Sequence, residues 1–435
     1  MNKINLKFVI IFFFSIKYSN LFAQDPQTTK NELRLDLEIR PRIEFKNNFG
    51  LTPADSINPE LINIQRNRLS ITYLRNKFKF HTSWQEIHLF GKQKQTSTIG
   101  SINAFELYIE PSLSKKIALR IGRQGITLDN GRMFSDAPWG QQSRAHEGLR
   151  LMYKNKKLNT DLITTFTRKY GMNFDAAYSP VASHRYKWLF IHYLKFKLNE
   201  NYTLTTINAT DIFERTDQPR NYYNRYTNGG RIEYFNKKFY ATINAFYQYG
   251  KNTAQKKIHA YYIQPEISQS IAQLKIRLGA EIQSGDNTAI QNTVDHNFVP
   301  LYGVAWKFMG NMNFFTRFPA DVGNSGLINP YLFFIYKISN KVSLRADEHL
   351  FYSQFGLLNK QKNAVNRYLG FENDFILNYK HSERLDMHLG ISYCLPTESM
   401  NLLKKIESPN QIPVWTYLMI SYKPKTLVFK NRNKA

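Results

Sequence analysis

The sequence predicts an all-β chain that closes into a transmembrane antiparallel β-barrel of about 18 strands (roughly 16 to 20), with short periplasmic turns and long extracellular loops. Two observations support this: stretches in which apolar and polar residues alternate, and connections between them that are alternately short and long. After the N-terminus, no run approaches the ~20 apolar residues that a spanning helix needs. The 435 residues include 15% aromatics and one cysteine, which argues against disorder and excludes an internal disulfide.

The N-terminal segment has the order of features of a secretory signal peptide. Lys3 and Lys7 precede an apolar run that ends near Ile16, and Ala23 offers a small residue for cleavage. A chain exported in this way and built from alternating strands is expected in the cell outer membrane. The predicted organisation is a signal peptide over 1–23, an outer-membrane barrel over 24–422 and a basic periplasmic tail over 423–435.

Residues 33–45 show the alternation most clearly. One parity is apolar (Leu33, Leu35, Leu37, Ile39, Ile43, Phe45) and the other is charged (Arg34, Asp36, Glu38, Arg40, Arg42, Glu44). Successive side chains of a strand point to opposite faces, so this pattern suits a wall with lipid on one side and water on the other. The pattern returns at 273–283, 341–349 and 384–393.

The connections give an independent estimate of the strand number. Short polar turns are expected at Arg75–Lys77, Pro111–Lys116, Lys154–Lys157, Leu198–Asn201, Asn236–Lys238, Ser270–Ala272, Ile338–Lys341 and Lys380–Glu383. Longer connections are expected at 46–62, 91–101, 125–147, 168–187, 212–226, 251–258, 284–328, 354–366 and 395–411. Seventeen connections correspond to about 18 strands, and a further hairpin within 301–318 would raise the number to about 20.

Motifs for enzymatic chemistry are weak. The ten histidines show no paired metal spacing, and no phosphate-binding glycine loop occurs, so we predict no metal, no cofactor and no catalytic residue. Ser143, His146 and Asp136 share one loop and would be the members of a triad, but no nucleophile-elbow glycines surround the serine. A nucleic-acid partner is not expected for an exported barrel.

The net charge of +26, or +23 without residues 1–23, suggests an anionic partner. Rings of Arg and Lys in a pore select for anions. By parity the inward basic set is Arg34, Arg40, Arg42, Arg120, Arg150, Arg231, Lys275, Arg277 and Arg345; the inward acidic set is Asp36, Glu38, Glu44, Glu106, Glu233, Glu281 and Asp347. Alternatively, these charges form salt-bridge ladders that only stiffen the wall.

Segment 117–150 resembles the alginate export family of outer-membrane barrels. The residues that carry the resemblance are Arg123, Gln124, Asp129, Arg132, Trp139, Gln141, Gln142, Arg144, His146 and Glu147. The opening RPRIE (40–44) and the later LPTESM (395–400) look like the branch found in Bacteroidetes-type bacteria. The resemblance implies a monomeric barrel whose electropositive constriction passes a polyuronate, with Arg123, Arg132 and Arg144 at that constriction.

Together these observations predict an outer-membrane porin or exporter that passes anionic poly- or oligosaccharides, or small anions. The candidate pore residues are Arg123, Arg144, Arg132, Arg120, Arg40, Arg42, Arg277 and Arg345, with Glu106, Glu110, Asp129 and Glu281 as acidic partners in the lumen. Loop 125–147 is expected to fold inward, and 284–328 to act as a lid or to shield the rim. Membrane lipid and lipopolysaccharide are expected to surround the barrel.

Two other classes of function remain open at this stage. One is an outer-membrane enzyme whose active site lies on the extracellular rim. The other is a structural or adhesive barrel with a plugged lumen. Conductance with anion selectivity marks the channel, a hydrolytic activity that depends on Ser143 or His146 marks the enzyme, and an electrically silent barrel marks the third class.

Overall fold

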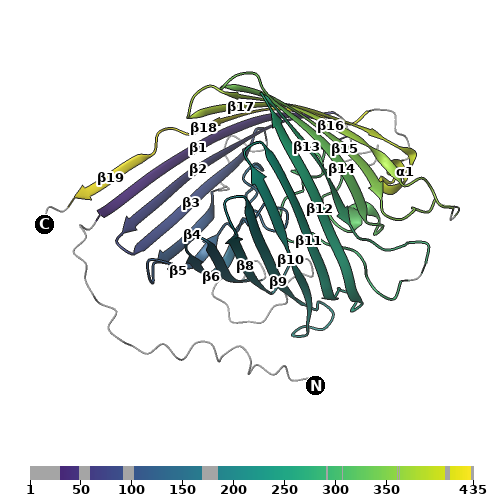
Figure 1. Cartoon of the computed structure of the whole chain (residues 1–435), viewed down its shortest axis with the longest axis horizontal. Coiled ribbons are helices and arrows are strands. Elements are labelled where there is room, and N and C mark those ends of the chain that lie inside the picture. The colour runs from purple at the N-terminus through teal and green to yellow at the C-terminus, as the bar shows by residue number, and fades with distance from the viewer. Residues whose placement is uncertain are drawn as a thin grey trace.

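The computed structural model describes residues 30–48, 59–91, 102–168, 185–290, 292–305, 307–359, 361, 363–406 and 412–432, so the predicted signal peptide lies outside the described residues. The chain forms a closed antiparallel barrel of 18 strands, as predicted, with one short helix (Figure 1). The barrel strands are β1 (Lys30–Asn47), β2 (Glu60–Arg75), β3 (Phe78–Leu89), β4 (Asn103–Pro111), β5 (Ile117–Gln124), β6 (His146–Lys154), β7 (Leu158–Phe166), β8 (Trp188–Lys197), β9 (Tyr202–Glu214), β10 (Tyr222–Asn236), β11 (Phe239–Lys251), β12 (Lys257–Ile271), β13 (Leu274–Gln283), β14 (Leu327–Lys337), β15 (Val342–Ser353), β16 (Tyr368–Lys380), β17 (Leu385–Pro396) and β18 (Val414–Tyr422).

The barrel closes between its first and last strands. β1 pairs along its length with β2, and its second half pairs with β18, for example Ile43 with Leu418. A nineteenth strand, β19 (Leu427–Arg432), pairs with the first residues of β1. Part of the predicted basic tail is therefore paired with the barrel. β19 continues the line of β18 along the same partner strand and extends away from the barrel (Figure 1).

The observed connections match the predicted ones closely. All eight short turns join the expected strand pairs, and the nine other connections lie at the opposite end of the barrel. The β9–β10 and β11–β12 connections are also short, at 215–221 and 252–256. The described part of 301–318 contains no strand, so the further hairpin does not form. Among the described residues, no helix has the length and hydrophobicity to cross a bilayer.

The two faces of the wall follow the predicted parity. On β1, Leu37 and Ile43 are 40% and 44% exposed on the outside, whereas Arg40 and Glu44 are 5% and 2% exposed inside. The apolar side chains remain exposed because lipid is their solvent, and the charged side chains are buried because other protein atoms fill the lumen. The barrel is thus apolar outside and polar inside.

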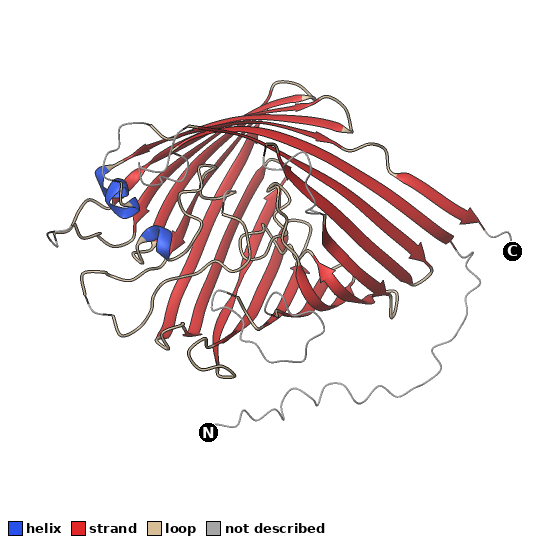
Figure 2. Ribbon diagram, turned by 180° about the vertical axis from the view of Figure 1, so that it is seen from behind, coloured by secondary structure: helices blue, strands red, loops and turns tan. Residues whose placement is uncertain are grey.

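The material that fills the lumen comes from two long loops. The β5–β6 loop (125–145) and the β13–β14 loop (284–326) cross the interior of the barrel (Figure 2). They are hydrogen-bonded to each other: Tyr302 N donates to Met133 O at 2.8 Å and Val304 N to Gly131 O at 3.0 Å. A Cβ on Gly303 would lie 1.9 Å from Arg132 O, so only glycine permits this approach.

Two short helical elements lie within the extracellular loops. The 3-10 helix η3 (Ala320–Val322) belongs to the β13–β14 loop, and the α-helix α1 (Glu398–Lys404) follows β17. Thr397 caps α1 by accepting from Met400 N, and Lys405 ends it in the left-handed conformation. Lys404 then donates to Phe314 O, which ties α1 to the β13–β14 loop.

Candidate substrate path through the lumen

Arg132 fixes the β5–β6 loop to the wall on one side. Its Nε donates to Glu281 Oε1 of β13 at 2.7 Å, and its Nη1 to Val304 O at 3.2 Å. Burial opposes the charged guanidinium, but Glu281 and Tyr262 outweigh it and raise the pKa of Arg132. Arg132 and Glu281 are 3% and 0% exposed, so this pair holds the loop and does not meet a passing solute.

Asp129 fixes the same loop to another part of the wall. Its carboxylate accepts from Tyr193 on β8 at 2.9 Å and from Thr205 on β9 at 2.8 Å. Burial raises the pKa of Asp129 despite these two donors. The residue predicted as an acidic partner of pore arginines is therefore a tether of the loop.

Three arginines of β1 and β2 hold the next part of the loop. Arg40 donates to Pro138 O at 2.7 Å and to Gly140 O at 2.6 Å, and Arg66 also reaches Gly140 O, at 3.0 Å. Arg68 donates to Ser143 Oγ at 2.7 Å. Carbonyl and hydroxyl oxygens satisfy the guanidinium groups of Arg40 and Arg68 without neutralising them, so the loop is fixed while the positive charge of these two residues remains.

The tip of the loop carries Trp139 across the lumen to the closing strands. Its ring packs at 5.9 Å from Trp415 and 5.6 Å from Tyr417 of β18, with edge-to-face geometry. The Arg42 guanidinium lies 4.8 Å from the Trp139 ring, and Arg42 is itself ion-paired with Glu44 at 2.6 Å. Arg144 joins this loop to the β13–β14 loop by donating to the carbonyls of Tyr302 and Gly303, and burial lowers its pKa.

Three cavities lie along these loops and share lining residues. The largest, about 600 Å³, is lined by Arg40, Arg66, Arg68, Trp139 and His388. The second, about 160 Å³, is lined by Trp139, His388, Arg345, Tyr417 and Lys307. The third, about 280 Å³, is lined by Lys307, Arg231, Arg277, Glu266 and Phe308. Trp139 lines both the first and the second cavity, and Lys307 lines both the second and the third, so the three cavities adjoin one another.

Most arginines of the inner wall are matched by a carboxylate. The pairs are Arg42–Glu44, Arg66–Glu38, Arg120–Glu110, Arg132–Glu281, Arg150–Asp161, Arg225–Asp211, Arg231–Glu233, Arg277–Glu266 and Arg345–Asp347. Most of the inner wall therefore carries the salt bridges that the sequence analysis gave as the alternative to free pore charges. Among the described residues that line the three cavities, Arg40, Arg68, Lys275 and Lys307 are the Lys and Arg side chains that make no ion pair with a carboxylate.

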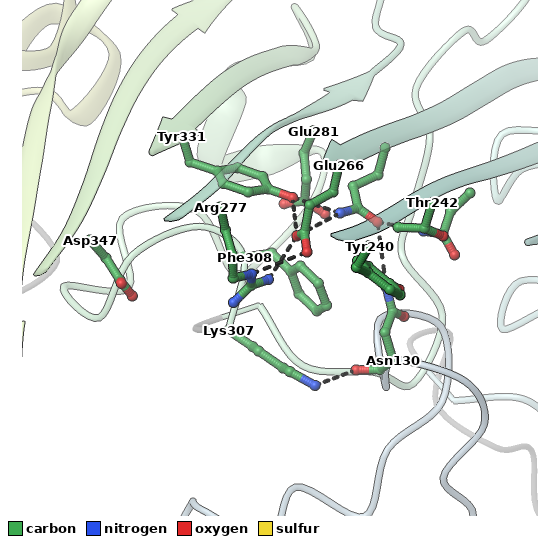
Figure 3. A network of polar contacts seen from close by, with 12 residues as sticks. Asn130, Tyr240, Thr242, Glu266, Arg277, Glu281, Lys307, Phe308, Tyr331 and Asp347 are labelled. Atoms are coloured by element: carbon green, nitrogen blue, oxygen red, sulfur yellow. Dashed lines mark hydrogen bonds and ion pairs between the residues drawn. The ribbon is translucent and has the colours of Figure 1, made fainter. Parts of the chain in front are cut away.

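Lys307 lies where two of the cavities meet. Its Nζ donates to Asn130 O at 2.9 Å and lies 5.7 Å from the centre of the Phe308 ring. Arg277, which is held by Glu266, lies beside Phe308 and Lys307 (Figure 3). Partial desolvation lowers the pKa of Lys307, and Arg277, Arg231 and Arg345 lower it further. A cation crowded by other cations is an unfavourable arrangement that an anion in the cavity relieves.

Arg123 is misplaced by the sequence prediction. It shares the outward parity of β5 with Ile121, and its neighbour across the ladder, Leu107, is 43% exposed to the outside. There it forms an exposed ion pair with Glu147 at 3.0 Å. Because a strand turns alternate residues outward, Arg120, Gly122 and Gln124 face the lumen and Arg123 cannot.

The other predicted residues either lie on the inner wall of the barrel or anchor a loop to it. Arg120 pairs with Glu110 at 2.6 Å and lies over Tyr108, outside the three cavities. Glu106 accepts from Gly125 N at 2.8 Å and so anchors the start of the β5–β6 loop. Arg40, Arg277 and Arg345 line cavities, and their role in a pore stays a prediction.

Sequence reasoning missed Arg66, Arg68 and Lys307. In β2 the pair Arg66 and Arg68 has the parity of Ser70 and Thr72, but polar Gln65 and Asn67 on the opposite parity obscure the alternation. Lys307 lies in a loop, where no periodicity indicates a direction.

The candidate catalytic triad is not assembled. Ser143 contacts Arg66 and Arg68, His146 Nδ1 contacts Tyr186 at 2.7 Å, and Asp136 accepts from Thr127 at 2.6 Å. Each of the three residues has a different set of partners. Although they are close in sequence, they do not have the geometry of a catalytic triad.

A ring of exposed basic residues surrounds the short-turn end of the barrel. Its members are Arg75, Lys77, Lys115, Lys116, Lys154, Lys156, Lys157, Lys197, Lys237, Lys238, Lys337, Lys341, Lys380, Arg384, Lys423, Lys425 and Lys430. Glu200 and Glu383 are the exposed acidic residues of these turns. The net charge therefore reflects this rim to a large extent and is a poor guide to the charge of the lumen.

No protein-family model and no curated protein sequence matches the chain, so its resemblance to the alginate export family stays a prediction. Solved structures do match. Pseudomonas aeruginosa OpdK with vanillate aligns with a TM-score of 0.60 at 12% identity over 91% of this chain and 99% of that one. The chain has the fold of an outer-membrane β-barrel. Pseudomonas aeruginosa OccK9 (OpdG) and OccK5 (OpdH) align with TM-scores of 0.62 and 0.58, at 10% and 11% identity, over 91% of this chain and 98% of each.

Proposed function

We propose that this outer-membrane barrel is a passive channel for small anions that carry a carboxylate, and that Arg40, Arg68, Lys275 and Lys307 are the cations that favour them. The observation that supports the proposal is the set of four cations without an ion pair that line three adjoining cavities. Nine basic and four acidic side chains line these cavities in all, so the lining carries an excess of positive charge.

The spacing of the cations suits conduction. A single charge-assisted hydrogen bond contributes about 1.5–3 kcal/mol, and water in the lumen weakens it further. Arg40 and Arg68 line the first cavity and Lys307 lines the other two, so an anion meets successive weak sites. Channels require such sites, because one strong site would bind the solute without releasing it.

The lining favours an anion with a flat or apolar body. Trp139, His388 and Met419 line the largest cavity beside its arginines, and Phe308 lines the third beside Lys307. An aromatic carboxylate presents both a charge and a face that stacks on such rings. OpdK, with the same fold, was crystallised with vanillate, a compound of this chemistry.

Uronates are the saccharides that fit the same chemistry. A uronate carries one carboxylate per sugar, and a cavity of about 600 Å³ accommodates a short oligomer at most. We therefore propose small carboxylates as substrates, with a short alginate-like oligouronate as the upper limit of size.

The proposal is tested by paired solutes that differ in one carboxylate. The purified barrel is reconstituted into liposomes, and uptake of galacturonate is compared with galactose, and of vanillate with vanillyl alcohol. We expect the acid to enter faster in both pairs at low salt, and planar-bilayer reversal potentials to show anion preference. Equal rates within both pairs contradict the carboxylate assignment, and a silent bilayer with folded protein favours the plugged structural barrel.

A further inference from the structure

The inner face of β15 and β16 carries a compact group of ionisable side chains that the substrate path does not explain. Asp347 and His349 of β15 face Asp374 and Glu372 of β16 across the ladder. One ligand atom from each of Asp347, His349 and Asp374 lies within 4.8 Å of the others. All four side chains are at most 4% exposed.

Glu372 and Asp374 each use one oxygen and leave the other unsatisfied. Glu372 Oε1 accepts from Met312 N at 2.7 Å, and Asp374 Oδ2 accepts from Asn311 N at 3.1 Å. Glu372 Oε2 and Asp374 Oδ1 are buried and have no hydrogen-bond partner within the described part of the chain. A buried carboxylate oxygen without a partner is strongly unfavourable, so these two atoms point to a missing counter-group.

The charge of the group is also unbalanced. Asp347 is ion-paired with Arg345, but Glu372 and Asp374 form no ion pair with any described Lys or Arg. Two adjacent buried carboxylates with no cation nearby repel each other. A divalent cation bound beside Asp374 would balance both charges and satisfy the free oxygen of Asp374.

His349 is oriented as metal-binding histidines are. Asn329 Nδ2 donates to Phe308 O at 2.7 Å, which turns its Oδ1 toward His349 Nδ1 at 3.2 Å. His349 Nδ1 therefore carries the proton, and Nε2 keeps its lone pair. A hydrogen bond on one ring nitrogen that frees the other for the metal is the usual arrangement around a ligating histidine.

We propose that the barrel wall binds a divalent metal ion of the zinc type through Asp347, His349 and Asp374. One imidazole nitrogen and two carboxylates suit zinc better than calcium, which prefers oxygen alone. The sequence alone gives no metal-binding motif here, because these ligands come from two different strands.

The metal would stabilise the β13–β14 loop. The candidate ligand Asp374 also accepts from Asn311 N, and its neighbour Glu372 accepts from Met312 N. Gly310 lies directly over Glu372, where a Cβ would be 2.2 Å from Oε1. Gly310 has a φ of +77°, which glycine adopts without strain. The same loop presents Lys307 to the substrate path, so the metal and the path are mechanically connected.

The test uses the full-length barrel purified in detergent after treatment with a chelator. The protein is incubated with Zn²⁺ or Ca²⁺, separated from free metal by gel filtration and analysed by inductively coupled plasma mass spectrometry. We expect one equivalent of Zn²⁺ per chain, little Ca²⁺, and a higher unfolding temperature with Zn²⁺. His349→Gln and Asp374→Asn should each weaken Zn²⁺ binding at least about tenfold. Asp211→Asn, which changes a buried carboxylate paired with Arg225, should bind Zn²⁺ like the wild type.

The wild-type titration decides the proposal even if a variant fails to fold. Absence of stoichiometric Zn²⁺, or retention of Zn²⁺ by both ligand variants, would overturn it. A barrel that binds neither metal but loses stability as the pH rises would assign a shared proton to Glu372 and Asp374 instead. The outcome is independent of the substrate experiment, which measures permeation and not metal content.

Discussion

Arg132 of the β5–β6 loop and Glu281 of β13 form a buried ion pair, with Nε and Oε1 2.7 Å apart, although 149 residues separate them in the chain. Tyr262 donates to the same Glu281 oxygen at 2.5 Å. The pair joins a loop that crosses the lumen to the wall, and the loop in turn binds the β13–β14 loop. The arrangement of the whole lumen depends on this connection.

Arg132→Met should destabilise the barrel, because it leaves Glu281 buried without its cation. The expected loss is about 3–5 kcal/mol, as for other buried pairs that lose one partner. Unfolding by urea in detergent, followed by tryptophan fluorescence, measures it. Arg123→Met breaks an exposed pair and should cost less than about 1 kcal/mol. The double variant Arg132→Met/Glu281→Gln should recover part of the loss. Equal losses of stability in Arg132→Met and Arg123→Met would contradict this interpretation.

Lys307→Gln combined with Arg68→Gln should reduce anion selectivity. Both residues are unmatched cations of the cavities, so the ratio of chloride to potassium permeability should fall by roughly tenfold at low salt. Reversal potentials in a salt gradient measure the ratio, and the effect should shrink near 1 M salt, where the Debye length is about 3 Å. The control, Arg120→Gln, removes a lumen arginine that is paired with Glu110 and lies outside the cavities. A similar change in the control would mean that total lumen charge, not position, sets selectivity.

Trp139→Ala should increase single-channel conductance while the barrel stays folded. The indole lies between two cavities and packs on Trp415 and Tyr417, so its removal merges the cavities into a wider space. Planar-bilayer recording measures the conductance, and heat-modifiable gel mobility checks folding. Trp84→Ala, which removes a 40% exposed ring on the outer face, should leave the conductance unchanged. An unaltered current in Trp139→Ala would place the constriction elsewhere.

The stability of the barrel should rise between pH 8 and 10.5 because of Lys404. Burial lowers the pKa of Lys404 to about 8, while Asp321 opposes this shift and Arg317 adds to it. In the unfolded chain the pKa returns to its ordinary value of 10.5, so between these values the unfolded state binds more protons and stability increases with pH. The increase is on the order of 3 kcal/mol.

Lys404→Met should remove this increase, because the side chain no longer titrates. Thermal unfolding in detergent across the same pH range compares the two proteins. Lys405→Met changes the exposed neighbouring lysine and should keep the wild-type slope. A wild-type stability that is constant or falls between pH 8 and 10.5, relative to Lys404→Met, would show that Lys404 is charged in the folded state.

The candidate site was predictable where it lies on strands. Arg40, Arg277 and Arg345 were correctly placed in the lumen, because parity alone fixes which face a strand residue occupies. The prediction for Arg123 was wrong because it followed the family resemblance, whereas the parity of Ile121 and Gly122 places this side chain on the outer face. Arg132, Arg144 and Asp129 are loop residues, and their partners Glu281, Tyr302 and Tyr193 are distant in sequence, so their role as tethers had no local signal.

The sequence by itself determined the barrel: its strand number, its turns and its two faces. Those features follow from the period of two along each strand and from the lengths of the connections, both of which are local properties of the chain. Only the tertiary structure decided how the lumen is filled, which arginines are neutralised and which cations remain unmatched. These depend on contacts between loops and wall residues a hundred or more positions apart, such as Arg40 with Gly140 and Arg132 with Glu281, and the local period of the sequence does not indicate such contacts.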